Sequence, residues 1–178
     1  NEKVSGIKVG FTNKKIWDKY SVNAPIFGFM YSSTILGIQQ PFSPEKFLEP
    51  KFEPEIFFKL SKKPHSEMSD IELISCCNSM GIGVELVQSI YEGWTFKLPD
   101  TVAGFGLHGQ YKILGEITIP SDENNKGTLI DGLKNFNLTL KKNNNILEQG
   151  NSKNILEEGP LAALRSYIEF CEKNSDWI

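Results

Sequence analysis

Two glutamates, Glu53 and Glu55, lie two residues apart in a segment that is otherwise apolar, Phe52-Glu53-Pro54-Glu55-Ile56-Phe57-Phe58. In a β-strand, residues i and i+2 point to the same face, so both carboxylates would face one place. Ionised carboxylates in apolar surroundings need an opposite charge or a bound cation beside them. The pattern therefore favours a strand that carries a cation-binding site over a purely structural strand.

A third carboxylate, Glu85, lies inside the apolar run Gly83-Val84-Glu85-Leu86-Val87, which is typical of a buried strand. Three carboxylates that leave further coordination positions open suit a hard cation such as Mg²⁺ or Mn²⁺. The alternative is that the acids lie on exposed strand faces, where isolated Glu-x-Glu pairs are usually found. The sequence thus indicates a metal site, with a solvated acidic face as the other interpretation.

Composition narrows the class of protein further. The chain has 178 residues, of which 39% are hydrophobic and 23% are charged, as in an ordinary globular protein. A net charge of −3 without any basic stripe argues against a nucleic-acid partner. The sequence contains no apolar run as long as a membrane span and opens with no signal peptide, so we expect a cytoplasmic protein without a membrane partner.

The three cysteines, Cys76, Cys77 and Cys171, are odd in number and follow no disulfide spacing. They predict no disulfide framework, which agrees with a reducing compartment. We expect Cys76 and Cys77 to be small core residues on a helix.

Apolar patterning and turn residues divide the chain into strands and helices. Strands are predicted at residues 52–60, 81–90 and 111–119, with extended segments over 26–38 and a hairpin formed by 136–142 and 146–149. Pro54 indicates an edge position or a bulge in the first of these strands. Helices are predicted at 14–20, 71–80 and 160–171, a flexible loop at 101–106 and a polar turn at 120–127. Paired strands with separate helices favour an α+β fold or a rolled mixed sheet.

Six segments, taken in order, resemble those of one enzyme family. They are Gly6-Ile7-Lys8-Val9-Gly10-Phe11-Thr12, Ala24-Pro25-Ile26-Phe27-Gly28, Glu53-Pro54-Glu55, Val84-Glu85-Leu86-Val87, the group of Trp94, Lys97 and Asp100-Thr101-Val102-Ala103, and Gly159-Pro160-Leu161-Ala162-Ala163-Leu164. Their order and spacing resemble the 2-keto-4-pentenoate hydratase and 4-oxalocrotonate decarboxylase family, which is part of the fumarylacetoacetate hydrolase superfamily. No single segment is decisive, but together they cover most of the chain.

The resemblance implies a mixed β-roll of the fumarylacetoacetate hydrolase C-terminal-domain type, with peripheral helices. It implies that Glu53, Glu55 and Glu85 hold Mg²⁺ or Mn²⁺, which polarises the 2-oxo group of a short 2-oxo acid. It also implies that Lys8 lies near the substrate as a catalytic and substrate-binding residue, and that Phe27 contributes to the substrate site.

By the same resemblance, the expected function is that of a metal-dependent lyase. The reaction would be a hydration of the 2-hydroxydienoate or 2-keto-4-pentenoate type through a metal-stabilised enolate, with a place in aromatic catabolism. A 2-oxo acid decarboxylase or a tautomerase of the same superfamily is the alternative, because these reactions share the enolate. Sequence alone separates them poorly.

Two loops depart from the family pattern. Gln88-Ser89-Ile90 stands where members usually carry Asp-Ser-Arg, and Gly104-Phe105-Gly106-Leu107-His108 stands where they carry Asp-Asn and small hydroxyl residues. His108 is therefore a candidate base in place of the missing loop residues. Asp100 is a second candidate catalytic residue, and the alternative is that it orients a loop or caps a turn. The departures also support a further hypothesis, a catalytically degenerate homologue that acts as a binding or assembly partner.

We expect residues 1–178 to form a single catalytic domain. Compared with the family pattern, this sequence lacks the usual N-terminal helical segment and the C-terminal strands, so a fragment or a shortened relative is expected. Strand edges left open in this way would need a partner chain. The resemblance itself implies a homo-oligomer or a complex with a related subunit.

Overall fold

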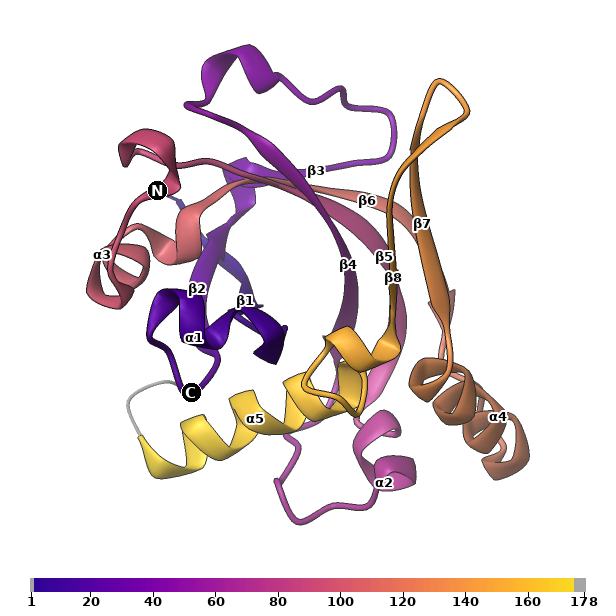
Figure 1. Ribbon diagram of the computed structural model, residues 1–178. Coiled ribbons are helices and arrows are strands. Elements are labelled where there is room, and N and C mark those ends of the chain that lie inside the picture. The colour runs from indigo at the N-terminus through magenta and orange to yellow at the C-terminus, as the bar shows by residue number, and fades with distance from the viewer. Residues whose placement is uncertain (1, 175–178) are drawn as a thin grey trace. The chain divides into compact units, whose positions relative to one another are not determined.

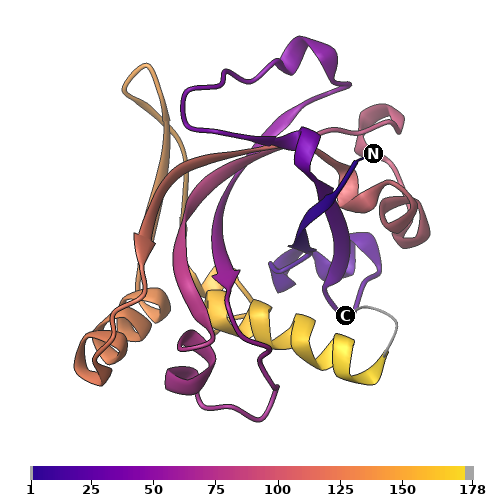
Figure 2. The same ribbon diagram turned by 180° about the vertical axis from the view of Figure 1, so that it is seen from behind.

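The computed structural model describes residues 2–174, and the labelled elements of Figure 1 are seen from behind in Figure 2. The chain divides into two compact units. The first contains the residues up to Phe11 together with Ile16–Phe57 and Gly81–Ile117, and the second contains Thr12–Lys15, Phe58–Met80 and the residues from 118 onward. All residues predicted for the functional site lie in the first unit.

Strands and helices alternate irregularly along the described residues, as in the predicted α+β class. The strands are β1 (Val4–Gly10), β2 (Ile26–Tyr31), β3 (Ile35–Leu36), β4 (Lys51–Leu60), β5 (Cys77–Val87), β6 (His108–Thr118), β7 (Asn137–Lys142) and β8 (Asn145–Asn151). The α-helices are α1 (Trp17–Tyr20), α2 (Asp70–Ile74), α3 (Leu98–Ala103), α4 (Glu123–Lys134) and α5 (Pro160–Lys173). Short 3-10 turns are η1 (Lys14–Ile16), η2 (Ser32–Thr34), η3 (Pro44–Lys46), η4 (Glu92–Trp94), η5 (Phe105–Leu107) and η6 (Ser152–Asn154).

The described strands pair in three sheets: β1 with β2, a four-stranded sheet in the order β3-β6-β5-β4, and β7 with β8. In the first unit, β1 and β2 run antiparallel and place Lys8 opposite Gly28; both strands are labelled in Figure 1. The order leaves β4 at an edge of its sheet, which confirms the position that Pro54 indicated, because proline has no N–H for a second neighbouring strand.

The second unit has its own core among α2, α4 and α5, which contact one another. Leu73 and Ile74 on α2 are fully buried, and Leu133 and Ile168 come from the other two helices. The helix predicted at 160–171 is confirmed as α5, with Pro160 in its first turn, where the missing N–H has no helical partner. None of the described helices combines the length and apolar character that a membrane crossing requires.

The helix predicted at 71–80 is wrong beyond its first part. α2 begins at a capping box, in which Ser69 and Glu72 exchange hydrogen bonds, and it ends at Ile74. Cys76 and Cys77 are buried as predicted, but Cys77 opens β5 instead of continuing a helix. A continuous apolar run is compatible with a buried helix or a buried strand, and here sheet pairing decides for the strand.

Two segments predicted to be irregular are helical. The polar turn predicted at 120–127 is largely helix α4, which Asp122 caps by accepting a hydrogen bond from the amide of Asn125 at 2.9 Å. The flexible loop predicted at 101–106 contains the last turn of α3. Both helices bury few side chains, so the sequence carries only a weak apolar stripe for either. The predicted hairpin, by contrast, is confirmed as β7 and β8.

Candidate metal centre and adjoining cavity

Glu53 and Glu55 on β4 and Glu85 on β5 bring together carboxylate oxygens that all lie within 4.8 Å of one another. β4 and β5 are neighbours in the sheet, and strand alternation turns Glu53 and Glu55 to the same face. Two oxygens on one divalent ion lie at most about 4 to 5 Å apart, which is twice the ion–oxygen distance. The three acids that the sequence singled out therefore form a donor set of a size that fits one ion.

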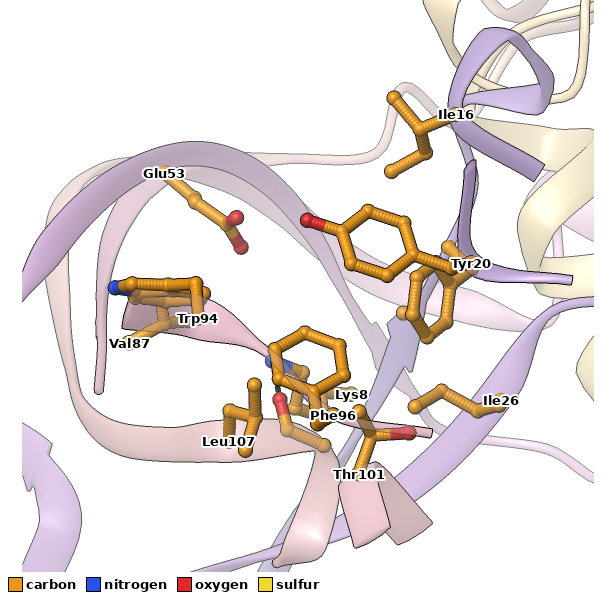
Figure 3. A pocket seen from close by; sticks show the side chains of 13 residues that line it. Lys8, Ile16, Tyr20, Ile26, Glu53, Val87, Trp94, Phe96, Thr101 and Leu107 are labelled. Atoms are coloured by element: carbon orange, nitrogen blue, oxygen red, sulfur yellow. Dashed lines mark hydrogen bonds between the residues drawn. The ribbon is translucent and has the colours of Figure 1, made fainter. Parts of the chain in front are cut away.

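Burial and mutual repulsion act on two carboxyl groups of this cluster. Burial raises the pKa of Glu55 well above its ordinary value, and the charges of Glu85 and Glu53 raise it further. Burial also raises the pKa of Glu53, although the charge of Lys8 opposes this. Glu53 stays solvent-accessible because its side chain projects into the cavity of Figure 3. The cluster thus holds more negative charge than its surroundings neutralise, which a divalent cation would correct.

Glu85 is bound differently, because it has two partners of its own. Nζ of Lys8 donates to both carboxylate oxygens at 2.8 Å and to the carbonyl oxygen of Gly106 at 2.9 Å. The pair is buried, with side-chain exposures of 9% for Lys8 and 2% for Glu85. Burial by itself raises the pKa of Glu85, but Lys8 and the hydrogen bond from His108 outweigh it and lower this pKa. Glu85 is therefore the member of the cluster whose pKa lies below its ordinary value.

Two glycines make room for the Lys8 side chain. A Cβ on Gly28 would lie 2.6 Å from the carbonyl oxygen of Phe105 and 3.3 Å from Cγ of Lys8. Gly106 has φ +67°, and a Cβ there would lie 3.2 Å from Cδ and Cε of Lys8. The approach of η5 to β2 around this lysine therefore requires glycine at both positions.

His108, at the start of β6, is hydrogen-bonded through both ring nitrogens. Nδ1 lies 2.7 Å from Oε1 of Glu85, and Nε2 lies 2.8 Å from Oγ1 of Thr34. Its side chain is only 4% exposed. While these hydrogen bonds persist, neither ring nitrogen can accept a proton from a substrate. The geometry therefore favours His108 as a residue that holds Glu85 in place over His108 as a general base.

A cavity of about 120 Å³ adjoins the cluster (Figure 3). A cavity of about 150 Å³ can hold a benzene-sized molecule, so this one suits a short ligand. Lys8, Glu53, Tyr20 and Thr101 contribute polar groups to the wall, and the rest is mainly apolar, with Phe11, Ile26, Val87, Trp94, Phe96 and Leu107. The rings of Tyr20 and Phe96 are stacked, with centroids 5.2 Å apart and an interplanar angle of 9°.

Of the predicted site residues, Lys8 and Glu53 line this cavity, whereas Glu55, Glu85, His108, Asp100 and Phe27 are not part of its wall. Asp100 accepts a hydrogen bond from the amide of Lys97 at 2.8 Å, and so caps the start of α3, the alternative that the sequence had left open. Phe27 lies next to Ile26 on β2, and alternation along the strand turns the two side chains to opposite faces. Of these two residues, only Ile26 is part of the cavity wall.

Sequence reasoning missed several residues that shape the site. Trp94 and Phe96 were not among the candidate site residues, yet both are half-buried and line the cavity. The glycine beside Trp94 was the available signal that it lies in a loop. Thr34 and the carbonyl of Gly106 carry no local signal, because their roles depend on partners far away in the sequence.

Comparisons with known proteins agree with the resemblance drawn from the motifs. No family model matches the chain. A 2-hydroxypent-2,4-dienoate hydratase of Pseudomonas putida is 30% identical over 118 residues, which are 65% of this chain and 52% of the relative. A 4-oxalocrotonate decarboxylase of a Pseudomonas species is 26% identical over 98 residues, which are 55% of this chain and 38% of the relative.

Solved structures share the fold. The 4-oxalocrotonate decarboxylase of Pseudomonas putida G7, complexed with magnesium and adipate, matches with a TM-score of 0.82 at 20% identity, over 97% of this chain and 63% of that one. A Yersinia pestis protein described as a member of the fumarylacetoacetate hydrolase family matches with a TM-score of 0.60 at 18% identity, over 91% and 72% of the two chains. The predicted fold class is confirmed. The chain spans about half the length of the curated relatives it matches, since the matched regions are 38% to 54% of their length.

Proposed function

We propose that this chain, a homologue of 2-keto-4-pentenoate hydratases, carries the metal and substrate site of an enzyme acting on short 2-oxo acids, with hydration of a 2-hydroxydienoate as its reaction. The observation that carries the proposal is the convergence of Glu53, Glu55 and Glu85 to within 4.8 Å. The curated relatives, which are hydratases and a decarboxylase, support it. The proposal treats residues 1–178 as one catalytic domain that works as a homo-oligomer or with a related subunit.

The three glutamates would hold Mg²⁺ or Mn²⁺. A hard divalent cation prefers such oxygen donors, and the solved decarboxylase of the same fold is complexed with magnesium in one structure and calcium in another. When bound, the cation would supply Lewis acidity that polarises the 2-oxo group. The raised pKa values of Glu53 and Glu55 support this assignment, because burial outweighs the opposing charge of Lys8 at both groups.

Lys8 would serve as a fixed positive charge in the wall of the cavity. Its Nζ already donates to Glu85 and to the Gly106 carbonyl, so it holds Glu85 in its ionised form. The same charge attracts a carboxylate entering the cavity. Lys8 would move a proton to a substrate atom only by exchanging one of these hydrogen bonds.

The cavity wall favours a hydratase over a decarboxylase. Among the described residues that line the cavity, Lys8 is the only cation. A 2-oxo acid with one carboxylate and an apolar tail would place that tail against Phe96 and Trp94, whereas a dicarboxylate would bury its second charge without a partner. The solved decarboxylase, by contrast, is complexed with adipate, a dicarboxylate.

One observation supports a second candidate, a catalytically weakened homologue that acts as a binding or assembly partner. His108 is hydrogen-bonded at both ring nitrogens, and Asp100 caps a helix, so neither candidate base faces the cavity unengaged. In this case metal and 2-oxo acid would still bind, but turnover would be absent.

Thermal melting with and without Mg²⁺ tests the metal site, because a ligand that binds only the folded state raises the melting temperature. We expect a rise for the unmodified protein and none for Glu55→Gln, with Glu45→Gln as the matched control, since Glu45 lies on η3 outside the cluster. Absence of any rise in the unmodified protein contradicts the proposal. Loss of the ultraviolet absorbance of a 2-hydroxydienoate then tests turnover, and metal binding without turnover favours the second candidate.

A further inference from the structure

A chain of hydrogen bonds runs from the backbone to the third carboxylate of the cluster. The hydroxyl of Thr34, at the end of η2, donates to the carbonyl oxygen of Tyr31 at 2.9 Å. Nε2 of His108 lies 2.8 Å from the same hydroxyl oxygen, and Nδ1 lies 2.7 Å from Oε1 of Glu85. Three elements, η2, β6 and β5, thus contribute one link each.

The carboxylate fixes the direction of one of these bonds. An ionised carboxylate only accepts, so Nδ1 of His108 donates to Oε1 of Glu85. The hydroxyl of Thr34 can donate as well as accept, so it can bond Nε2 whether or not this nitrogen carries a hydrogen. In either case the Thr34 hydroxyl orients the imidazole, and the imidazole in turn holds Glu85.

The hydrogen bonds to Glu85 distinguish its two oxygens. Lys8 lies 2.8 Å from each of them and does not discriminate, whereas His108 bonds Oε1 alone. A carboxylate oxygen has about two acceptor positions. Lys8 and His108 fill both positions on Oε1, whereas Lys8 fills one on Oε2. Oε2 is therefore the oxygen of Glu85 that remains able to bind a cation shared with Glu53 and Glu55.

We propose that His108 and Thr34 are positioning residues that fix the rotation of the Glu85 carboxylate and leave Oε2 for the metal; this rests on the metal site proposed above. The terminal torsion of a glutamate is broad, so a carboxylate held by Lys8 alone can exchange its two oxygens. Groups that orient a metal ligand in this way commonly change metal affinity by about 10- to 100-fold when removed. His108 then acts through Glu85 and not on the substrate.

The test measures Mg²⁺ affinity by titration calorimetry, which needs no turnover. We expect His108→Ala to weaken Mg²⁺ binding about 10- to 100-fold, and Thr34→Val to weaken it in the same direction by a smaller factor. Thr34→Ser keeps the hydroxyl and should restore affinity to within about twofold, a rescue that a general packing role of the threonine methyl would not produce. Mn²⁺ bound to each variant, followed by electron paramagnetic resonance, should show an altered ligand environment for His108→Ala and an unaltered one for Thr34→Ser.

Matched controls come from the same chain. Thr128→Val removes a hydroxyl that bonds the carbonyl oxygen of Asn124 on α4, and His65→Ala removes a histidine with a 63% exposed side chain. Both lie in the second unit and should leave Mg²⁺ affinity unchanged. Thermal melting of metal-free protein checks that each variant is folded. If His108→Ala does not fold, Thr34→Val tests the positioning role in its place.

The outcomes separate this inference from the proposed function. If the unmodified protein binds no Mg²⁺, the proposed metal site is wrong and the inference falls with it. If the unmodified protein binds Mg²⁺ and both His108→Ala and Thr34→Val bind it equally well, the metal site stands and the positioning role is overturned. If only His108→Ala weakens binding, the part assigned to Thr34 is overturned.

Discussion

Lys8 and Glu85 are 77 residues apart in the sequence, yet Nζ of Lys8 lies 2.8 Å from both carboxylate oxygens of Glu85. Both side chains are buried, so removing one charge leaves the other without its counter-charge. Lys8→Met should lower the free energy of unfolding by about 3 kcal/mol, measured by urea denaturation in metal-free buffer. Lys8→Met combined with Glu85→Gln should recover most of this loss, because residue 85 then carries no charge that needs the lysine.

A surface ion pair provides the control for Lys8. Lys14 and Glu157 are 2.7 Å apart, but their side chains are 41% and 69% exposed. Lys14→Met should cost less than about 1 kcal/mol, because solvent screens exposed pairs. A cost for Lys8→Met no greater than that for Lys14→Met would show that the buried pair contributes nothing particular to stability.

The crowded carboxylates predict that Glu55→Gln stabilises the metal-free protein. Burial and two neighbouring acids act against the ionised form of Glu55, and glutamine keeps the shape without the charge. We expect the free energy of unfolding in EDTA to rise by about 1 kcal/mol, whereas the stabilisation by added Mg²⁺ should disappear. A destabilised Glu55→Gln protein in EDTA would mean that the repulsion is already relieved by other groups.

The sequence predicts the features that follow local rules and misses those that depend on distant partners or on a weak apolar pattern. Glu53 and Glu55 share a face because strand alternation is a local rule, so their convergence could be predicted from spacing. Thr34 could not be assigned, because its partner His108 is 74 residues away and nothing local marks the contact. Helix α4 was missed because its polar sequence buries little besides Ile130 and Leu133, which weakens the periodic signal.

Asp70 in the second unit predicts a specific pH dependence of stability. Lys134 and Arg165 donate to its carboxylate at 2.7 Å and 3.0 Å. Burial by itself raises the pKa of Asp70, but these two partners outweigh it and lower the pKa below its ordinary value of 3.8. A carboxyl group with a lowered pKa adds stability that is fully present above the ordinary value and is lost as pH falls through the lowered one. Asp70→Asn should therefore be about 1 kcal/mol less stable than the unmodified protein near pH 7.

This difference between Asp70→Asn and the unmodified protein should shrink below about pH 4, when urea denaturation is repeated at pH 7, 5, 4 and 3. Asp18→Asn is the control, because Asp18 is exposed on α1 in the first unit. A difference that stays constant down to pH 3 would show that the ion pairs of Asp70 do not contribute through its charge.

Two glycines that differ in their surroundings should respond in opposite ways to a methyl group. A Cβ on Gly28 would lie 2.6 Å from the Phe105 carbonyl oxygen, so Gly28→Ala must displace η5 and with it the approach to Lys8. We expect a loss of about 2 kcal/mol. Gly127 lies within α4, and a Cβ there would meet no atom within 4 Å beyond its own helix backbone, so Gly127→Ala should gain about 0.5 to 1 kcal/mol. Equal effects in urea denaturation would contradict the close packing around Gly28.

Phe96 should contribute to the binding of a substrate tail and not to that of its 2-oxo acid head. Its ring stacks on Tyr20 and lines the cavity as an apolar surface, without an atom that could ligate a metal ion. In the presence of Mg²⁺, Phe96→Ala should weaken 2-oxopentanoate about tenfold, the loss expected from removing roughly 1.4 kcal/mol of apolar contact. Pyruvate has the same head group with a single methyl, so its affinity should change less than about twofold. If titration calorimetry shows equal losses of affinity for both acids, Phe96 acts on the head group or on the metal site. The argument that the apolar wall selects the substrate would then be wrong.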